Sequence, residues 1–124
     1  MSKKRILLVD DEPDFVETVE FFLSGSDYQV LVAKNGKKAL EQVKNQKPDL
    51  ILLDVMMPEM DGLEACKRLK NDPTTNSIPI IMLTAKGRKE DVVEAIAAGA
   101  DSYIVKPFNL SDLVERIEET LNPN

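Results

Sequence analysis

Histidine and tryptophan are both absent from the 124 residues of the chain. Without an imidazole, the chain has no Ser-His-Asp triad, no His-rich zinc site and no imidazole general base. A single cysteine, Cys66, excludes an internal disulfide and favours a reducing compartment. Cys66 falls in a helical pattern with Leu63 and Leu69, so we expect a buried apolar thiol rather than a reactive one.

Long apolar runs are also missing. The basic residues Lys3, Lys4 and Arg5 precede only Ile6–Val9 before two aspartates interrupt the run. A secretory signal needs about 7–15 apolar residues, and a membrane-spanning helix needs about 20. We therefore expect a cytoplasmic protein with no membrane partner.

Basic residues are too few to balance the acidic ones. The chain has 16 Lys and Arg against 22 Asp and Glu, a formal charge of −6, which opposes direct binding to nucleic acid. A hydrophobic content of 43% with 31% charged residues is typical of a soluble globular protein. The length is that of one ordinary domain, and we expect residues 1–124 to form a single domain.

Strand-like and helix-like segments alternate five times along the chain. Apolar or β-branched runs predict strands at residues 6–9, 28–33, 49–53, 78–83 and 102–105. Apolar residues at helical spacing follow each of them. Pro13 suits the first turn of the first helix, Gly25 is expected to cap its end, and Asn109 is expected to start the last helix. The alternation predicts an α/β fold, a parallel sheet with helices on both faces.

Polar side chains stand at the ends of four predicted strands. They are Asp10 and Asp11, then Asp54, Thr84 and Lys106. Because ligands bind outside the carboxyl ends of strands in open parallel sheets, we expect these side chains to converge. Asp54 is the most conspicuous, since it ends an apolar run that reads as a strand buried on both faces.

Three converging carboxylates need a compensating cation. Two unit charges about 5 Å apart at an effective dielectric of about 20 repel by roughly 3 kcal/mol. Oxygen ligands without His or Cys favour a hard divalent ion, and Mg²⁺ commonly binds through one or two carboxylates plus phosphate oxygens. We therefore predict a Mg²⁺ site beside Asp54, with Asp54 as the nucleophile that forms an acyl phosphate. Lys106 would stabilise the developing charge and Thr84 would donate a hydrogen bond.

Each of these residues, taken alone, has an ordinary structural explanation. Asp10 and Asp11 suit the cap of a helix, and Asp54 suits a turn. Thr84 alone reads as a loop hydroxyl, and Lys106 alone as a solvated strand end. Their occurrence at successive strand ends, with compatible charges, favours the functional explanation.

The motifs that surround these residues are specific in their order and spacing. They are Val9-Asp10-Asp11, Leu53–Gly62, Leu83-Thr84-Ala85, Gly99-Ala100-Asp101 and Lys106-Pro107-Phe108. Over essentially its whole length the sequence resembles a bacterial two-component response regulator receiver domain. The resemblance implies a chemotaxis-regulator-like, flavodoxin-like fold, with a five-stranded parallel sheet of order 2-1-3-4-5 and five helices on both faces.

The resemblance also implies a phosphorelay function. Asp54 would accept a phosphoryl group from a phosphohistidine of a sensor histidine kinase or a histidine phosphotransfer protein. Mg²⁺ or Mn²⁺ would be held by Asp11, Asp54 and the backbone carbonyl of Met56, with Asp10 close by. Such a domain is a regulatory phosphoacceptor rather than an enzyme, and catalyses only its own phosphoryl transfer and slow self-dephosphorylation.

A conformational switch is implied as well. Thr84 would move toward the phosphoryl group and Tyr103 would turn inward behind it, although the residues alone favour a half-buried strand aromatic for Tyr103. The Lys106-Pro107 bond is commonly cis in the family. The responding face would be the fourth helix, fifth strand and fifth helix.

The partners implied for that face are a downstream protein or an effector domain. The resemblance leaves open a phosphorylation-dependent homodimer, paired through charged residues that include Lys89, Asp91, Glu94, Arg116 and Glu118, although solvated helix faces explain such residues more often. No effector domain follows Leu121, so we expect either a stand-alone receiver or part of a longer regulator. Met56 and Lys86 occupy the two positions that tune the phosphate lifetime, and neither suits the orientation of an attacking water, which predicts slow dephosphorylation.

Three other classes of protein remain open from the residues. A hydrolase of the aspartyl-phosphatase type would want a second Asp two residues after Asp54, where Met56 stands. A flavodoxin-like electron carrier would need a phosphate-cradling loop after the first strand, where Asp10, Asp11 and Glu12 would repel the phosphate. A phosphate-independent binding module has no need of the acidic, Thr and Lys positions together.

Overall fold

The computed structural model describes residues 3–55, 61–84 and 89–122, without the side chains of Lys89 and Asp91. The strands are β1 (Arg5–Val9), β2 (Gln29–Ala33), β3 (Leu50–Asp54), β4 (Ile80–Thr84) and β5 (Ser102–Val105). The helices are α1 (Pro13–Gly25), α2 (Gly36–Gln46), α3 (Gly62–Asn71), α4 (Lys89–Ala97) and α5 (Leu110–Leu121). The strands form one parallel sheet in the order β2-β1-β3-β4-β5, so the expected α/β fold and strand order are confirmed.

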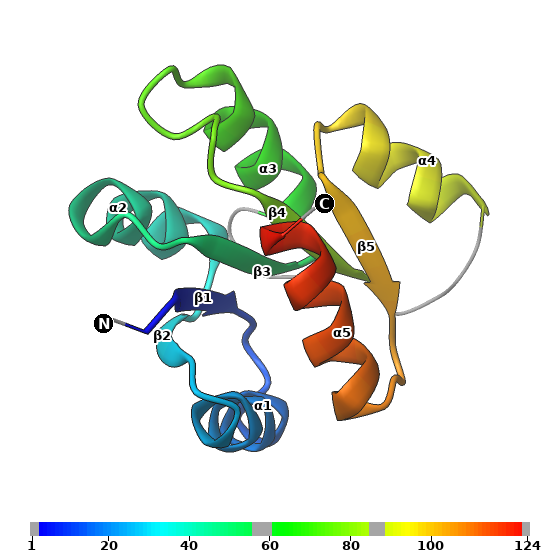
Figure 1. The fold of residues 1–124 in the computed structure, drawn as a ribbon. Helices are drawn as coiled ribbons and strands as arrows, with labels where there is room; N and C mark the ends of the chain where they lie inside the picture. The colour runs from blue at the N-terminus through cyan, green and yellow to red at the C-terminus, as the bar shows by residue number, and fades with distance from the viewer. Residues whose placement is uncertain (1–2, 56–60, 85–88, 123–124) are drawn as a thin grey trace.

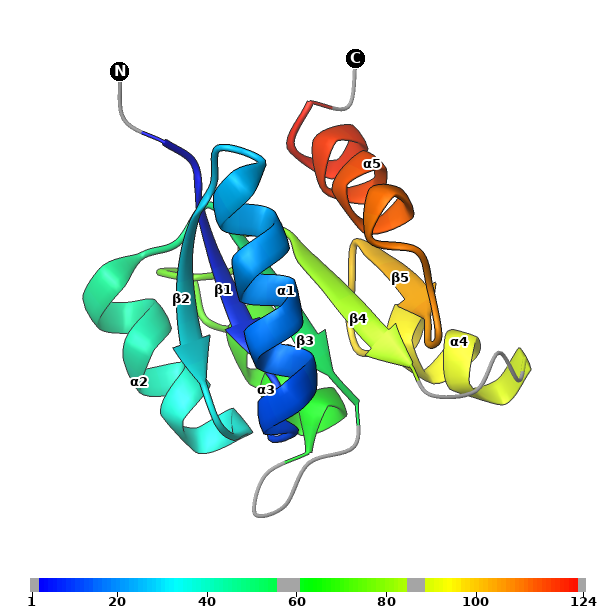
Figure 2. The same ribbon diagram turned by 90° about the horizontal axis from the view of Figure 1, so that it is seen from below.

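Helices cover both faces of the sheet. Helices α1 and α5 lie on one face, and α2, α3 and α4 lie on the other (Figure 1). The strand arrowheads all point the same way when the sheet is seen past α1 and α5 (Figure 2). The carboxyl ends of the strands therefore share one edge of the sheet, as the prediction of a site requires.

Side-chain alternation along the strands builds two cores. In β3 every residue is buried; Leu50 and Leu52 pack toward α1 and α5, while Ile51 and Leu53 pack toward α2, α3 and α4. A strand apolar on both faces suits the centre of a parallel sheet covered by helices. Truncation of one such leucine to alanine typically costs about 2–5 kcal/mol, so β3 is a rigid support for the residue that ends it.

Several element ends differ from the sequence-based expectation. Helix α1 ends at Gly25, but its C-cap is Ser26, whose N–H donates to the carbonyls of Phe22 and Leu23. The left-handed residue is Asp27, at φ 73°, so the expectation that Gly25 caps the helix is wrong. Asp tolerates this conformation better than most residues because its short polar side chain can bond locally.

The fourth strand begins two residues later than the apolar run suggests. Ile78 donates its N–H to the carbonyl of Thr75 in the preceding turn, which leaves Ile80 as the first strand residue. At the other end, Thr84 belongs to β4 and Asp54 belongs to β3, so both are strand residues rather than loop residues. Their positions are therefore fixed by the sheet.

One of the family-like motifs builds the amino edge of the sheet, away from the predicted site. Gly99 has φ 100°, which favours glycine, and it turns the chain from α4 into β5. The Asp101 carboxylate accepts the N–H of Ile80 at 2.8 Å and pairs with the Lys70 ammonium at 2.8 Å. Asp101 thus ties β4, β5 and α3 together.

Cys66 lies in the core between α3 and the sheet. It is fully buried, as expected, and its thiol contacts the carbonyl of Ala98. Burial raises the pKa of the Cys66 thiol to about 11, with a lowering contribution from Lys70 and a raising one from Asp101.

In the described part of the chain, no helix is long and apolar enough to cross a bilayer.

Candidate functional site

Three predicted site residues converge at the carboxyl edge of the sheet. Asp10 follows β1, Asp54 ends β3 and Lys106 follows β5. Asp10 donates its N–H to the carbonyl of Ala33 at 3.2 Å, and Lys106 donates its N–H to the carbonyl of Thr84 at 2.7 Å. The Lys106-Pro107 peptide bond is cis, as the resemblance implied.

The period-2 alternation of strands explains why these three side chains meet. The even-numbered residues of β1, β3 and β5, such as Leu8, Leu52 and Ile104, pack on the side of α1 and α5. Asp10, Asp54 and Lys106 continue that parity, so their side chains leave the sheet on the same face. The alternation of side chains along the strands therefore explains why Asp10, Asp54 and Lys106 converge.

Lys106 lies at the centre of the group. Its ammonium nitrogen is 2.9 Å from Asp10 Oδ2, 3.7 Å from Glu12 Oε1 and 3.9 Å from Asp54 Oδ2, and its side chain is 16% exposed. The structural alternative of a solvated strand end is therefore wrong for Lys106. Among the described residues, one ammonium faces three carboxylates, so their summed formal charge is negative.

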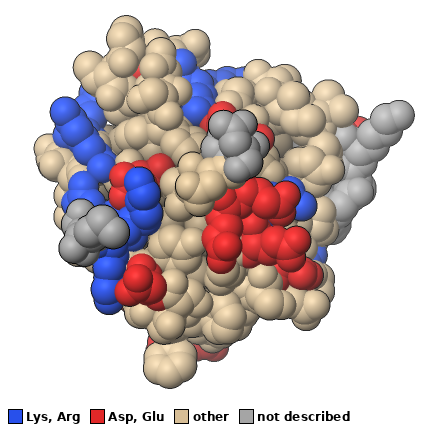
Figure 3. Space-filling model, viewed as in Figure 1, with Lys and Arg blue, Asp and Glu red and all other residues tan. Residues whose placement is uncertain are grey.

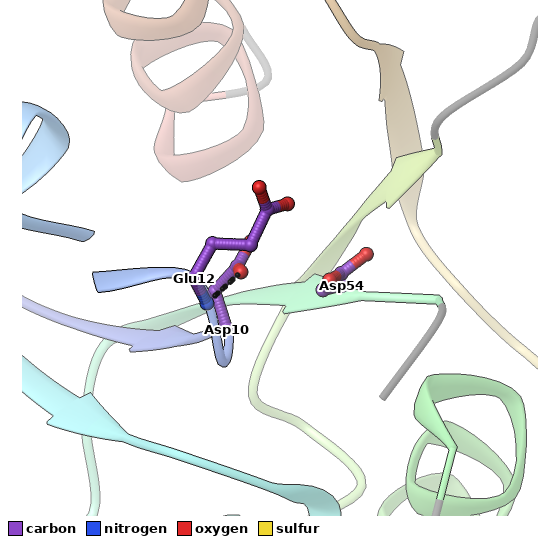
Figure 4. Close-up of side chains that lie close together, drawn as sticks. All are labelled: Asp10, Glu12 and Asp54. Atoms are coloured by element: carbon purple, nitrogen blue, oxygen red, sulfur yellow. Dashed lines mark hydrogen bonds between the residues drawn. The ribbon is translucent and has the colours of Figure 1, made fainter. Parts of the chain in front are cut away.

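The carboxylates form a cluster of Asp10, Glu12 and Asp54, with one oxygen from each within 4.8 Å of the others. Figure 4 shows Asp10 and Glu12 on the turn after β1 and Asp54 on β3. Asp10 and Asp54 are buried and Glu12 is exposed at the rim. Asp10 Oδ1 accepts the N–H of Glu12 at 3.0 Å, which fixes the turn that carries both acids.

The donor set fits a hard divalent cation. Each donor is a carboxylate oxygen, the type of ligand that Mg²⁺ prefers. Thr84 ends β4, the strand next to β3; it is 1% exposed, and its Oγ1 has no hydrogen-bond partner among the described residues. A buried unpartnered hydroxyl is costly.

Glu12 takes a place that the sequence assigned to Asp11. The Asp11 side chain is exposed and is not in the cluster, so its role as a ligand stays a prediction. The turn closed by the hydrogen bond from the Glu12 N–H to Asp10 Oδ1 brings Glu12 beside Asp10. The signal for Glu12 was present in the acidic run Asp10-Asp11-Glu12. Met56, predicted as a carbonyl ligand, and Lys86 lie outside the described residues.

The capping explanation for the aspartates is not supported. Glu12, rather than either aspartate, is the N-cap residue of α1, and its own side chain makes no capping hydrogen bond. Pro13 occupies the first turn, as expected.

Thr84 and Tyr103 lie on the opposite face of the sheet from Asp10, Asp54 and Lys106. Tyr103 is half-buried and packs against the core on the side of α2, α3 and α4, together with Met82. Thr84 follows Met82 by two residues in β4, so alternation places it on that same side. The Tyr103 carbonyl accepts a hydrogen bond from Arg116 at 2.5 Å. The two residues are thus placed on one face, and their switch role stays a prediction.

Gly62 packs directly against the backbone of the predicted nucleophile. A Cβ at this position would lie 2.0 Å from the carbonyl oxygen of Asp54. The N–H of Gly62 donates to the carbonyl of Val55 at 3.0 Å, and Asp61 caps α3 by accepting the N–H of Glu64 at 2.9 Å. The start of α3 therefore closes against the end of β3, which only glycine permits.

The chain is similar to known proteins in sequence and in fold. The family profile described as response regulator receiver domain matches residues 6–118. The chain belongs to the response regulator receiver family. It is 45% identical to the phosphate regulon transcriptional regulatory protein PhoB of Pseudomonas aeruginosa over 98% of this chain and 53% of that protein. It is 42% identical to the alkaline phosphatase synthesis transcriptional regulatory protein PhoP of Bacillus subtilis over 95% of this chain and 48% of that protein.

Solved structures of receivers superpose closely on this one. A putative response regulator from Chloroflexus aurantiacus matches with a TM-score of 0.93 and 38% identity, over 97% of this chain and 98% of that one. A CheY-like receiver domain protein from Methanospirillum hungatei matches with a TM-score of 0.91 and 34% identity, over 98% and 96%. The receiver spans about half the length of the curated relatives it matches.

Proposed function

We propose that this receiver accepts a phosphoryl group on Asp54 from a phosphohistidine of a sensor histidine kinase or phosphotransfer protein. The observation that carries the proposal is the position of Asp54, a buried carboxylate ending a rigid central strand, 3.9 Å from the Lys106 ammonium. A carboxylate is a competent nucleophile for acyl phosphate formation, and a held ammonium favours the charge that accumulates on the transferring group.

In the transfer, an Asp54 carboxylate oxygen attacks phosphorus. The new P–O bond forms as the P–N bond to the donor imidazole breaks, and the imidazole leaves with the electron pair of that bond. Lys106 stabilises the charge on the phosphoryl oxygens, and the Thr84 hydroxyl donates to one of them. Asp54, Asp10, either Glu12 or Asp11, and the carbonyl of Met56 would hold Mg²⁺ or Mn²⁺, and the ion would supply positive charge to the carboxylates and to the incoming phosphoryl oxygens.

Phosphorylation replaces the Asp54 carboxylate, which carries one negative charge, by an acyl phosphate with about 1.5–2 negative charges, and the proposal includes a shift of the α4-β5-α5 face in response. Thr84 and Tyr103, on one side of the sheet, are suited to couple the site to α4. Figure 3 shows carboxylates gathered over α5, where Asp112, Glu115, Glu118 and Glu119 are all exposed. The guanidinium of Arg116, on the same helix, donates hydrogen bonds to Ser102 Oγ and to the Tyr103 carbonyl, and is thus directed toward β5.

The output partner is proposed to be a separate effector domain or protein. Relatives named as transcriptional regulators support a transcriptional output, whereas the acidic composition opposes direct DNA contact by this domain. A homodimer through α4-β5-α5 would bring two acidic α5 surfaces together. If a second copy is the partner, its association should therefore strengthen as salt is added.

Acetyl phosphate with Mg²⁺ tests the phosphoacceptor function directly. We expect intact-mass spectrometry to show one added phosphoryl group, and the label to disappear in Asp54→Asn. After removal of the donor, the label should decay more slowly than in a Met56→Asn/Lys86→Glu variant, which would supply groups able to orient water. Persistence of the label in Asp54→Asn would overturn the assignment, and would return the hydrolase and binding-module alternatives.

A further inference from the structure

A phenylalanine of α1 lies against the ammonium of the site lysine. The Lys106 nitrogen is 4.1 Å from the centroid of the Phe15 ring, within the range of a cation–π interaction. Phe108 meets Phe15 edge-on, with centroids 6.0 Å apart and ring planes at 84°. The ammonium thus has carboxylates as charged neighbours and an aromatic face as an uncharged one, and the second ring holds the first in orientation.

We infer that Phe15 is a positioning residue that keeps the Lys106 ammonium directed at Asp54. The inference rests on the proposed phosphoacceptor function and adds a residue to it. In this role Phe15 acts on the reaction through Lys106.

The geometry shows why a lysine here needs such a neighbour. Its four-carbon stem is flexible, and the ammonium is nearer to Asp10, at 2.9 Å, than to Asp54, at 3.9 Å. Carboxylates that engage a divalent cation lose much of their attraction for the lysine. The ring face does not bind that cation or the phosphoryl group in competition, so Phe15 can hold Lys106 in both situations.

The position of Phe15 at the edge of the core allows its ring to be replaced by mutation. Together with Lys106, Pro107 and Phe108, it lines an open groove of about 570 Å³ between α1 and the β5–α5 connection. It packs only at the margin of the core on the α1 and α5 side. Leucine should therefore replace the ring without a collapse of the fold, while it removes the quadrupole that attracts the cation.

A double-mutant cycle tests the inference. Phe15→Leu should slow labelling by acetyl phosphate about threefold to tenfold, Phe15→Tyr should restore the rate, and Phe15→Leu should have no further effect in a Lys106→Met background. Phe22→Leu is the matched control, since it removes a ring from the same helix away from Lys106, and should leave the rate unchanged. Thermal unfolding verifies that each variant is folded.

A second measurement needs neither Mg²⁺ nor phosphoryl donor. Ring currents should shift the ε-methylene proton resonances of Lys106 upfield in wild type, and Phe15→Leu but not Phe15→Tyr should abolish the shift. An unchanged Lys106 resonance, an unchanged labelling rate in Phe15→Leu, or an equal slowing in the Lys106→Met background would each overturn the positioning role. Absence of any label in wild type would instead refute the phosphoacceptor function, so the two failures are distinguishable.

Discussion

Gly62 limits how the end of β3 can meet the start of α3. Its missing side chain allows a backbone approach that a Cβ, 2.0 Å from the Asp54 carbonyl oxygen, would prevent. Since the neighbour is backbone, the clash cannot be relieved by a rotamer change, and either Asp54 or the first turn of α3 must move.

We predict that Gly62→Ala destabilises the fold by about 1–3 kcal/mol and slows phosphoryl labelling, because overpacking at this contact displaces Asp54. Urea unfolding and the acetyl phosphate time course measure the two effects. Gly25→Ala is the matched control: a Cβ there meets nothing within 4 Å, and alanine in a helix is favoured over glycine by about 0.5–1 kcal/mol. Equal stability changes in the two variants would contradict this account.

The buried Cys66 thiol should make the free energy of unfolding depend on pH. Its pKa is about 11 in the folded protein, whereas the ordinary value is 9.0. Between these values the unfolded chain loses its proton first, so unfolding becomes more favourable as pH rises from about 9 to about 11. Below pH 9 both states are protonated and the effect vanishes.

We therefore expect the free energy of unfolding to fall by up to about 2–3 kcal/mol from this group across that window. Urea titrations at pH 8 and pH 10.5 measure the change, with Cys66→Ala as the comparison, because lysines and tyrosines titrate in the same range. A loss of stability as large in Cys66→Ala as in wild type would show that Cys66 is not its source.

The sequence predicted the positions of Asp54 and Lys106 but did not predict the places of Phe15 and Glu12 at the site. Asp54 and Lys106 could be placed because a charged residue at the end of a buried strand has few packing explanations. Phe15 could not, since helical periodicity assigns it to the core and says nothing of a cation above its ring. Glu12 was passed over because an exposed acid before a helix has an ordinary reading at the helix terminus.

At the scale of elements, the sheet divides its tasks between its two edges. The carboxyl edge holds the acidic cluster, whereas at the amino edge Asp101 joins β4, β5 and α3. Sequence patterns predicted the order of the strands and helices. The residues at which these elements begin and end depend on hydrogen bonds in the connecting segments, which the patterns do not reveal. Ile78 shows this: it is apolar and β-branched, yet its N–H is used by a turn.

Asp101→Ala should destabilise the protein by about 1–3 kcal/mol, because it leaves the Ile80 N–H without its side-chain acceptor and the Lys70 ammonium without its carboxylate partner. Labelling of the folded fraction by acetyl phosphate should be unchanged, since the substitution lies at the far edge of the sheet. Lys70→Met separates the ion pair from the backbone contact and should cost less. A labelling defect in folded Asp101→Ala protein would show that the edges are coupled.

The molecule as a whole carries a formal charge of −6, and among the described residues three carboxylates lie together beside Lys106. We expect a divalent cation at this cluster to reduce the repulsion between the carboxylates. Any ligand that binds the folded state alone stabilises it, by about 1.4 kcal/mol at ten times its Kd.

Millimolar Mg²⁺ should therefore raise the midpoint of thermal unfolding, and Asp54→Asn or Asp10→Asn should reduce that increase. Sodium chloride at matched ionic strength controls for general screening of the net charge. The same increase with sodium chloride, or in both variants, would argue against a divalent site at this cluster.

The parallel topology has a consequence for folding. Asp10 and Lys106 are in contact across a sequence separation of 96 residues, and the strands that carry them are not neighbours in the sheet. Contacts between such distant parts of a chain form only after the intervening segments are ordered. Partly folded chains should thus be unable to take up the phosphoryl group, and a nascent chain should stay silent in signalling until β5 has left the ribosome and joined the sheet.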